Sequence, residues 1–188
     1  MGSEMCIRDS CGIEMTGDSY SVIKHCFWNI QGFKSQILGK KLISQDFRNE
    51  IQNSDIMGLA ETHIHEQVLG DLDIPGYVRK HFKNRKAHSN GKCGSGGLAI
   101  FCKPDISEFV TKINNENDDT IWVKIGKNLF GKEKDTYLAT CYISPNGTKE
   151  TIEKKIEKLC EEIVRFQGKG NVIIQGDFNA RTNKKEIR

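Results

Sequence analysis

The stretch NVIIQGDFNA, residues 171–180, joins a short apolar run to a group of polar residues. Residues 171–175 have the length and the β-branched content of a buried strand, and Gly176 follows at once with Asp177 and Asn179. Functional side chains in α/β sheets gather beyond the carboxyl ends of strands, although Gly, Asp and Asn also form ordinary turns. The stretch therefore predicts a strand that ends either in a functional site or in a plain turn.

A helix is predicted immediately before this strand. Thr148 can cap its first turn, and Gly168 and Gly170 can stop it. Between them, apolar residues recur at helical spacing and form one stripe, namely Ile152, Ile156, Leu159, Ile163 and Val164.

Further upstream, strand patterns follow one another at short intervals. Residues 56–60 are almost continuously apolar, which predicts a strand buried on both faces, and residues 40–53 carry apolar side chains at the spacing of an amphipathic helix. The other predicted strands, from residue 77 onward joined by hairpins, span residues 21–28, 77–82, 97–102, 120–125 and 136–143. This order favours an α/β fold with sheets covered by helices over an all-β barrel or a helix bundle.

Length and composition are those of one domain. The 188 residues are 37% hydrophobic and 28% charged, which is enough for one substantial core. Residues 1–19 show no periodicity, so we assign them to a leader outside the fold and the domain to residues 20–188. No apolar run approaches the roughly 20 residues of a membrane span, so we expect no membrane contact.

Charge and cysteine content bear on partners and compartment. The formal net charge of +3 permits contact with a polyanion but does not demand it. An odd set of cysteines without a Cys-x-x-Cys pair favours reduced core thiols and an intracellular protein. They are Cys6, Cys11, Cys26, Cys93, Cys102, Cys141 and Cys160.

Three predicted strands end in polar residues. Asn29 follows the first strand, Glu61 follows the strand at residues 56–60, and Asp177 and Asn179 follow the last. Carboxylates suit Mg²⁺, which takes only one or two of them from a protein, and amides can hold a water or phosphate oxygen without adding negative charge. Hydrolysis of a phosphodiester needs a metal, a base that takes the proton of water, and donors that place the phosphate. These residue types can fill all three roles.

Tyr142 lies near the end of the predicted strand at residues 136–143, just before the turn Ser144-Pro145-Asn146. The turn would expose the phenol at the same rim, where it could donate to a phosphate oxygen. The alternative is a strand tyrosine with its ring in the core and its hydroxyl at the surface.

Five short blocks occur in a fixed order: WNIQG at residues 28–32, LAETH at 59–63, GGLAI at 96–100, YISP at 142–145 and GDFNA at 176–180. In this order they resemble the endonuclease/exonuclease/phosphatase family. They are most similar to the endonuclease domain of LINE-type retrotransposon polyproteins, relatives of the apurinic/apyrimidinic endonucleases. The resemblance covers about residues 22–181.

The resemblance implies a four-layer α/β sandwich, two sheets flanked by helices. It implies that Asn29 and Glu61 match the metal site, with Mg²⁺ or alternatively Mn²⁺ as the cofactor. Asp177 matches the aspartate that positions or activates the attacking water, Asn179 matches its transition-state partner, and Tyr142 matches a phosphate-contacting tyrosine. The implied partner is DNA, with a reverse transcriptase domain downstream in the full-length protein and the nucleus as a compatible location. No obligate protein partner is expected.

The chain departs from the family pattern at its C-terminal end. Family members continue into strands that deliver a Ser-Asp-His type motif, whose histidine contacts the scissile phosphate, and no such motif follows Arg181. We therefore expect a domain that is incomplete at its C-terminus, with an incomplete second sheet and no measurable nicking by this chain.

Three further patterns are weaker. Residues 126–132 have the glycine and lysine spacing of a P-loop, but Glu133 replaces its Ser or Thr and a strand follows, so a hairpin turn is the better interpretation. His63 and His65 could begin a zinc site but lack a third ligand. The basic loop at residues 83–92 is either solvated or a contact for the phosphate backbone.

The leading hypothesis from the sequence is Mg²⁺-dependent nicking of DNA. Two alternatives stay open. One is a family phosphodiesterase that acts on abasic DNA or another phosphate ester. The other is a non-catalytic nucleic-acid-binding remnant of a decayed mobile element.

Overall fold

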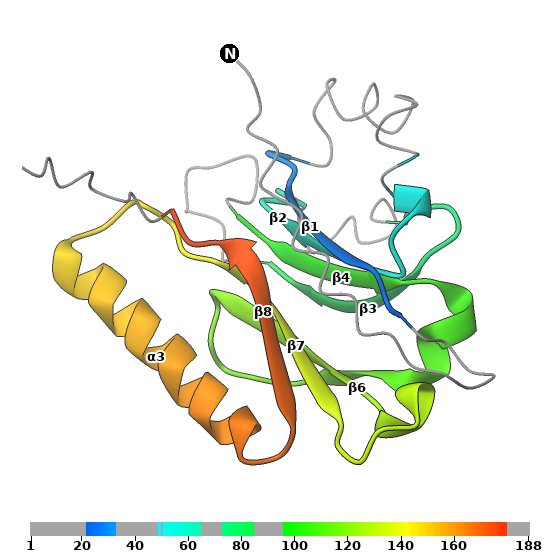
Figure 1. Cartoon of the computed structure of the whole chain (residues 1–188). Coiled ribbons are helices and arrows are strands. Elements are labelled where there is room, and N and C mark those ends of the chain that lie inside the picture. The colour runs from blue at the N-terminus through cyan, green and yellow to red at the C-terminus, as the bar shows by residue number, and fades with distance from the viewer. Residues whose placement is uncertain (1–21, 33–48, 50, 65–72, 85–95, 180–188) are drawn as a thin grey trace, which may run out of the picture.

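The computed structural model describes residues 22–32, 49, 51–64, 73–84 and 96–179. These residues form two four-stranded sheets packed face to face, with the helix α3 (Lys149–Gln167) against the outer face of the second sheet (Figure 1). The predicted leader and loop residues 85–95 lie outside the described residues. So does most of the predicted helix at residues 40–53, of which residues 49 and 51–53 are described; residues 49, 51 and 52 are helical and residue 53 is in a turn.

The first sheet has the strand order β1-β2-β4-β3. β1 runs parallel to β2, and both β2 and β3 pair antiparallel with β4. All five residues of β2 are buried, as its continuous apolar sequence predicts. The strands are β1 (His25–Asn29), β2 (Ile56–Ala60), β3 (Val78–Lys83) and β4 (Leu98–Cys102).

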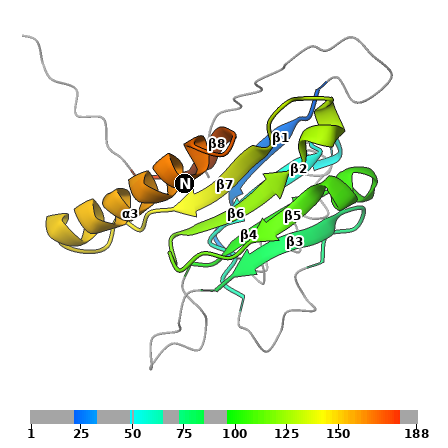
Figure 2. The same cartoon turned by 90° about the horizontal axis from the view of Figure 1, so that it is seen from below.

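The second sheet has the strand order β5-β6-β7-β8. β6 pairs antiparallel with β5 and β7, while β8 returns parallel to β7 after the crossover through α3. Figure 2 shows α3 on the side of this sheet where β7 and β8 lie. The 3₁₀-helix η2 (Pro104–Phe109) leads from β4 into β5, and η3 (Lys127–Phe130) connects β6 to β7. The strands are β5 (Val110–Ile113), β6 (Thr120–Ile125), β7 (Thr136–Tyr142) and β8 (Asn171–Asp177).

Helix α3 begins and ends where its sequence predicts. The Thr148 hydroxyl accepts a hydrogen bond from the Thr151 N–H at 3.3 Å, and Gly168 caps the last turn. The Phe166 ring packs on the sheet, with its centroid 4.5 Å from the ring of Trp122 and 4.9 Å from that of Tyr137. Among the described residues, no helix combines the length and the apolar character that a membrane crossing requires.

Alternation along the strands separates the apolar side chains into layers. In β2, Ile56 and Ala60 belong to the cluster between the two sheets, whereas Met57 and Leu59 belong to a second cluster that includes Ile51. A third cluster lies between the second sheet and α3. The arrangement confirms the prediction of an α/β sandwich.

Several local predictions need correction. The pairs β3–β4 and β6–β7 are antiparallel as predicted, but β4 and β6 are not neighbours, because the chain passes through η2 and β5 into the other sheet. No sequence pattern predicted β5 or the 3₁₀-helices. Cys102 and Cys141 are buried free thiols, but Cys160 is exposed on α3, so its predicted core position is wrong.

Candidate functional site

The predicted polar residues meet where β1, β2 and β8 end. Because β1 and β2 are parallel, with Asn29 opposite Ala60 in the register, Asn29 and Glu61 lie side by side at one end of the first sheet. β8 ends with Asp177 in the second sheet, and β1 contacts β8 across the space between the sheets. The structure thus brings Asn29, Glu61 and Asp177 together, as the sequence predicts.

The side-chain amide of Asn29 links the three residues. Its Nδ2 donates to Oε1 of Glu61 at 3.2 Å and to Oδ2 of Asp177 at 2.9 Å. Its Oδ1 accepts from the N–H of Gln31 at 3.2 Å. One amide therefore bridges a carboxylate of the first sheet and a carboxylate of the second.

Asn179 supports Asp177 from the other side. The Asn179 N–H donates to Oδ1 of Asp177 at 2.9 Å, and its side-chain Nδ2 donates to the Ile143 carbonyl at 2.9 Å. The Ile143 N–H in turn donates to the Asp177 carbonyl at 2.9 Å. These bonds fix the Asp177 carboxylate and turn the Asn179 amide toward the end of β7.

The backbone is strained around this group. In the described part of the chain, four residues other than glycine have positive φ: Gln31, Glu61, His63 and Asn179, at 51°, 53°, 51° and 47°. All four belong to the segments that follow β1, β2 and β8. Such conformations cost about 1–3 kcal/mol each and cluster at functional sites, where surrounding bonds enforce them. The Gly32 N–H, which donates to the Glu61 carbonyl at 2.7 Å, is one such bond.

Tyr142 is placed differently from its prediction. It pairs with Asp177 in the register of β7 and β8, but it is only 9% exposed and belongs to the apolar cluster between the sheets. Of the two placements that the sequence left open, the exposed phenol at the rim is therefore wrong, and the ring in the core is the one found. Every residue of β7 is buried, because the first sheet covers one face of this strand and α3 covers the other.

His63 lies at the edge of the site. Its Nε2 is 3.6 Å from Oε2 of Glu61, and its side chain is partly exposed. His65 lies outside the described residues. Within the residues that are described, no three His, Cys, Asp or Glu side chains gather into a group that could hold a metal ion, so no zinc site of that kind is found among them.

The donor set still fits Mg²⁺, which needs only one or two protein carboxylates and keeps several waters. Glu61 and Asp177 are hard oxygen donors that converge on one nitrogen. Asn29 presents that nitrogen, and its oxygen faces Gln31, so the amide would have to turn over to coordinate a cation itself. Of the two residues predicted at the metal site, Glu61 therefore fits the role of a metal ligand. Asn29 fits the role of a neighbour that holds the carboxylates in place.

Cys141 is close to the site but chemically inert. Burial, followed by the charges of Asp177 and Asp119, raises the pKa of its thiol to about 12. The thiol therefore stays protonated at neutral pH, and neither a nucleophile nor a metal ligand is available from it.

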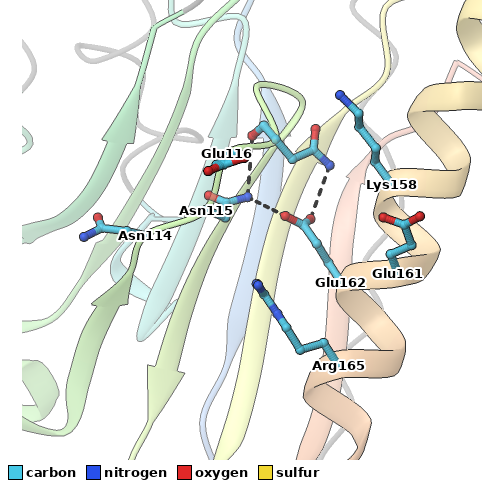
Figure 3. Close-up of a pocket in the computed structure, with 8 residues that line it drawn as sticks. Asn114, Asn115, Glu116, Lys158, Glu161, Glu162 and Arg165 are labelled. Carbon is cyan, nitrogen blue, oxygen red and sulfur yellow. Dashed lines mark hydrogen bonds between the residues drawn. The ribbon is translucent and has the colours of Figure 1, made fainter.

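A second polar group, which the sequence did not predict, lies between α3 and the β5–β6 loop. Glu162 is buried and accepts from the side chains of Asn115 at 2.8 Å, Thr120 at 2.6 Å and Trp122 at 3.0 Å. It borders a hollow of about 510 Å³ (Figure 3), whose lining residues are Asn114, Asn115, Glu116, Asn117, Lys158, Glu161, Glu162 and Arg165. No predicted site residue lines it. The available sequence signal was the position of Glu162, three residues after the buried Leu159 and thus on the same face of α3.

Lys83, which begins the basic loop, is tied to the fold. Its Nζ donates to the carbonyls of Asn115 and Asn117 at 2.9 and 2.7 Å, and burial lowers its pKa. Lys83 therefore anchors the β5–β6 loop. The other basic residues of the predicted loop lie outside the described residues.

A scan against family models matches residues 26–187 to the endonuclease/exonuclease/phosphatase family. The match includes Asn29, Glu61, Tyr142, Asp177 and Asn179. A search of curated protein sequences found no significant match.

Solved structures share the fold at low sequence identity. The AP endonuclease from Leishmania major superposes with a TM-score of 0.59 at 14% identity, over 86% of this chain and 56% of that one. The human Nocturnin catalytic domain superposes with a TM-score of 0.56 at 19% identity, over 86% of this chain and 65% of that one. A mannosyl-6-phosphatase from Bacteroides thetaiotaomicron superposes with a TM-score of 0.57 at 16% identity, over 87% of this chain and 67% of that one. The chain thus spans between about half and two thirds of the length of such structures.

Proposed function

Because the chain belongs to the endonuclease/exonuclease/phosphatase family, we propose that its domain hydrolyses phosphodiester bonds of DNA with Mg²⁺, as the endonuclease of a LINE-type retrotransposon protein. The observation that carries the proposal is the Asn29 amide, which holds Glu61 and Asp177 together from two different sheets. Residues that only formed turns at the strand ends would not need a hydrogen bond from one sheet to the other. In this proposal a reverse transcriptase lies downstream and the protein acts in the nucleus.

Each residue has a role that its contacts allow. Glu61 would hold Mg²⁺, and the bound ion would offset the negative charge of the phosphate. Asp177, each of whose carboxylate oxygens accepts one hydrogen bond and keeps a second lone pair, would take the proton of the attacking water. Asn29, whose two N–H groups are engaged by Glu61 and Asp177, would hold these carboxylates in place. The Asn179 amide would donate its second N–H to a phosphate oxygen beside its bond to the Ile143 carbonyl, and Tyr142 would reach the phosphate only through the tip of its largely buried ring.

DNA is the substrate that the five sequence blocks favour. The positive net charge is compatible with it, and an AP endonuclease is among the similar structures. The likeness to a mannosyl-6-phosphatase shows that the same fold also serves other phosphate esters. Abasic DNA and simple phosphate esters therefore belong in the same assay as plasmid DNA.

The first test measures metal binding, which does not depend on turnover. Mn²⁺ titration followed by electron paramagnetic resonance should show a site that Glu61→Gln and Asp177→Ala weaken. The control Glu153→Gln, an exposed change on α3, should leave binding unchanged. Equal Mn²⁺ binding by all four proteins would overturn the assignment of the site.

The second test is nicking of supercoiled plasmid in Mg²⁺. If the chain nicks DNA, Asp177→Ala should lower the rate by about 100-fold or more, the range of general base catalysis. Unchanged nicking would overturn the role of Asp177. Salt-sensitive DNA binding with neither nicking nor site-specific Mn²⁺ binding would instead support the non-catalytic alternative.

A further inference from the structure

A buried polar chain joins the two sheets beneath the candidate site. Gln175 of β8 is buried, and its Oε1 is 3.0 Å from Nδ1 of His25 in β1. Its Nε2 donates to the hydroxyl of Thr140 in β7 at 3.1 Å. Because the Gln175 oxygen can only accept, His25 must carry its hydrogen on Nδ1. Three strands from both sheets thus meet in one hydrogen-bonded chain.

Gly58 makes room for this chain in the middle of β2. A Cβ at residue 58 would come within 3.0 Å of both Gln175 Nε2 and Thr140 Oγ1. Glycine in a strand interior weakens the strand unless another group needs the space. Here the space is filled by the polar side chains of the opposite sheet.

The polar chain joins the same two strands as the candidate site. Gln175 precedes Asp177 by two residues and therefore lies on the same face of β8. His25 precedes Asn29 by four residues and lies on the same face of β1. The pair His25–Gln175 and the pair Asn29–Asp177 are consequently two polar ties between β1 and β8.

On the side of β1 and β8 the other contacts between the sheets that the structure describes are mainly apolar, whereas β3, at the far edge of the first sheet, has polar ties of its own to the second sheet through His81 and Lys83. Phe27, which lies between His25 and Asn29, packs against the inter-sheet cluster. Apolar burial is non-directional and tolerates a small sliding of one sheet on the other. Hydrogen bonds at 3.0 and 3.1 Å to a buried amide do not tolerate it, since a shift would leave buried polar groups unpaired.

We infer that Gln175, with His25 and Thr140, is a positioning residue that holds β1 against β8 so that the Asn29 amide reaches Asp177. The functional part of this inference rests on the proposed function. Gln175 itself touches neither metal nor substrate in this scheme. It acts by fixing the offset of the two sheets on which the site is built.

The test compares Gln175→Met, which keeps the length of the side chain and removes both hydrogen bonds, with Gln175→Glu. The glutamate can accept from His25 and from the Thr140 hydroxyl, whose hydrogen is free to rotate, so it should preserve the tie. Glu162→Gln is the matched control, because it perturbs a buried polar group on the other face of the second sheet. Thermal unfolding of every variant identifies temperatures at which all are folded.

The direct readout is the side-chain NH₂ signal of Asn29 in ¹⁵N NMR. Both hydrogens should be protected from exchange in the wild-type protein, in Gln175→Glu and in Glu162→Gln, and exposed in Gln175→Met. Unchanged protection in folded Gln175→Met would overturn the inference. This readout needs no metal and no substrate, so it stands even if the proposed function fails.

The functional readout is Mn²⁺ affinity. Gln175→Met should weaken binding by about tenfold, as the loss of a supporting residue behind metal ligands does, while Gln175→Glu and Glu162→Gln stay close to the wild type. Insensitivity of Mn²⁺ binding to Glu61→Gln would contradict the proposed function. Sensitivity to Glu61→Gln combined with wild-type affinity in Gln175→Met would contradict the inference alone.

Discussion

The Asn29 amide offsets the repulsion between two carboxylates. Glu61 and Asp177 both accept from its Nδ2, and hydrogen bonds to charged acceptors are about twice as strong as neutral ones. An aspartate at residue 29 would add a third negative charge at the same point. Asparagine is therefore the residue that can hold the two acids together while its oxygen remains engaged with Gln31.

His81 gives the fold a dependence on pH. It is 4% exposed, and its Nδ1 donates to the Trp122 carbonyl at 3.0 Å. Burial lowers its pKa to about 4, helped by Lys112 and Lys83 and opposed by the hydrogen bond to Trp122. In the unfolded chain the pKa is about 6.5. As pH falls from about 6.5 to 4, the unfolded state takes up a proton that the folded state does not, so stability is lost on acidification.

We predict that this loss amounts to about 3 kcal/mol across that window and that His81→Gln removes it. Urea unfolding at pH 7.5 and pH 4.5 measures the difference, with His63→Gln as the control for a partly exposed histidine. If wild type and His81→Gln lose equal free energy of unfolding between the two pH values, His81 is not responsible.

The site residues that could be predicted from the sequence are those with a recognisable local position. Asn29, Glu61 and Asp177 each follow an apolar strand, and that position predicted their meeting. The contact between His25 and Gln175 spans 150 residues and is not indicated by any such position, because it depends on how two sheets stack. Tyr142 was misplaced because the depth of the inter-sheet core cannot be seen in a single strand.

Among the elements, strand β2 is the most constrained. Its five residues are buried, and Gly58 faces Gln175 and Thr140 at a distance that no Cβ tolerates. An added methyl group must push these side chains away or spread the two sheets. Overpacking of this kind typically costs about 1–3 kcal/mol.

We therefore predict that Gly58→Ala lowers the free energy of unfolding by that amount. Gly126→Ala is the matched control, since its Cβ would meet only the Phe109 carbonyl, at 3.6 Å. Urea denaturation of both variants makes the comparison. A Gly58→Ala protein as stable as Gly126→Ala would show that the sheets can yield at this point.

Elements with strong periodicity or capping were predictable, and the others were not. The apolar run of β2 and the Thr148 cap of α3 are visible in the sequence. β5 has four residues, two of them exposed, so it leaves no period to detect. Its assignment to the second sheet is decided by pairing with β6, which is a property of the folded chain.

At the scale of the whole molecule, the described sheets have open edges on the side of the site. β1 borders the first sheet and β8 borders the second, each with one partner strand among the described residues. Three large apolar side chains of the described residues are also exposed: Ile156 and Val164 on α3, and Phe178 directly after β8. Unpaired edges and apolar surface favour association between copies.

We predict that the chain self-associates as its concentration rises and that Val164→Lys shifts it toward the monomer. Val164 is 68% exposed, so the substitution removes apolar surface without opening the core. Gln167→Lys, an exposed change on the same helix, controls for the added charge. Sedimentation velocity over a concentration series measures the effect. A wild-type chain that stays monomeric throughout would contradict the prediction.

The separation of Asn29 and Asp177 in the sequence determines when the site can form during synthesis on the ribosome. The two residues that share a hydrogen bond are 148 positions apart, so a ribosome that adds about 5–20 residues per second needs roughly 7–30 seconds between them. Until Asp177 is made, the nascent chain has Asn29 and then Glu61 without their partner in the second sheet. Any activity of this site would therefore begin only after every described strand of both sheets has been made.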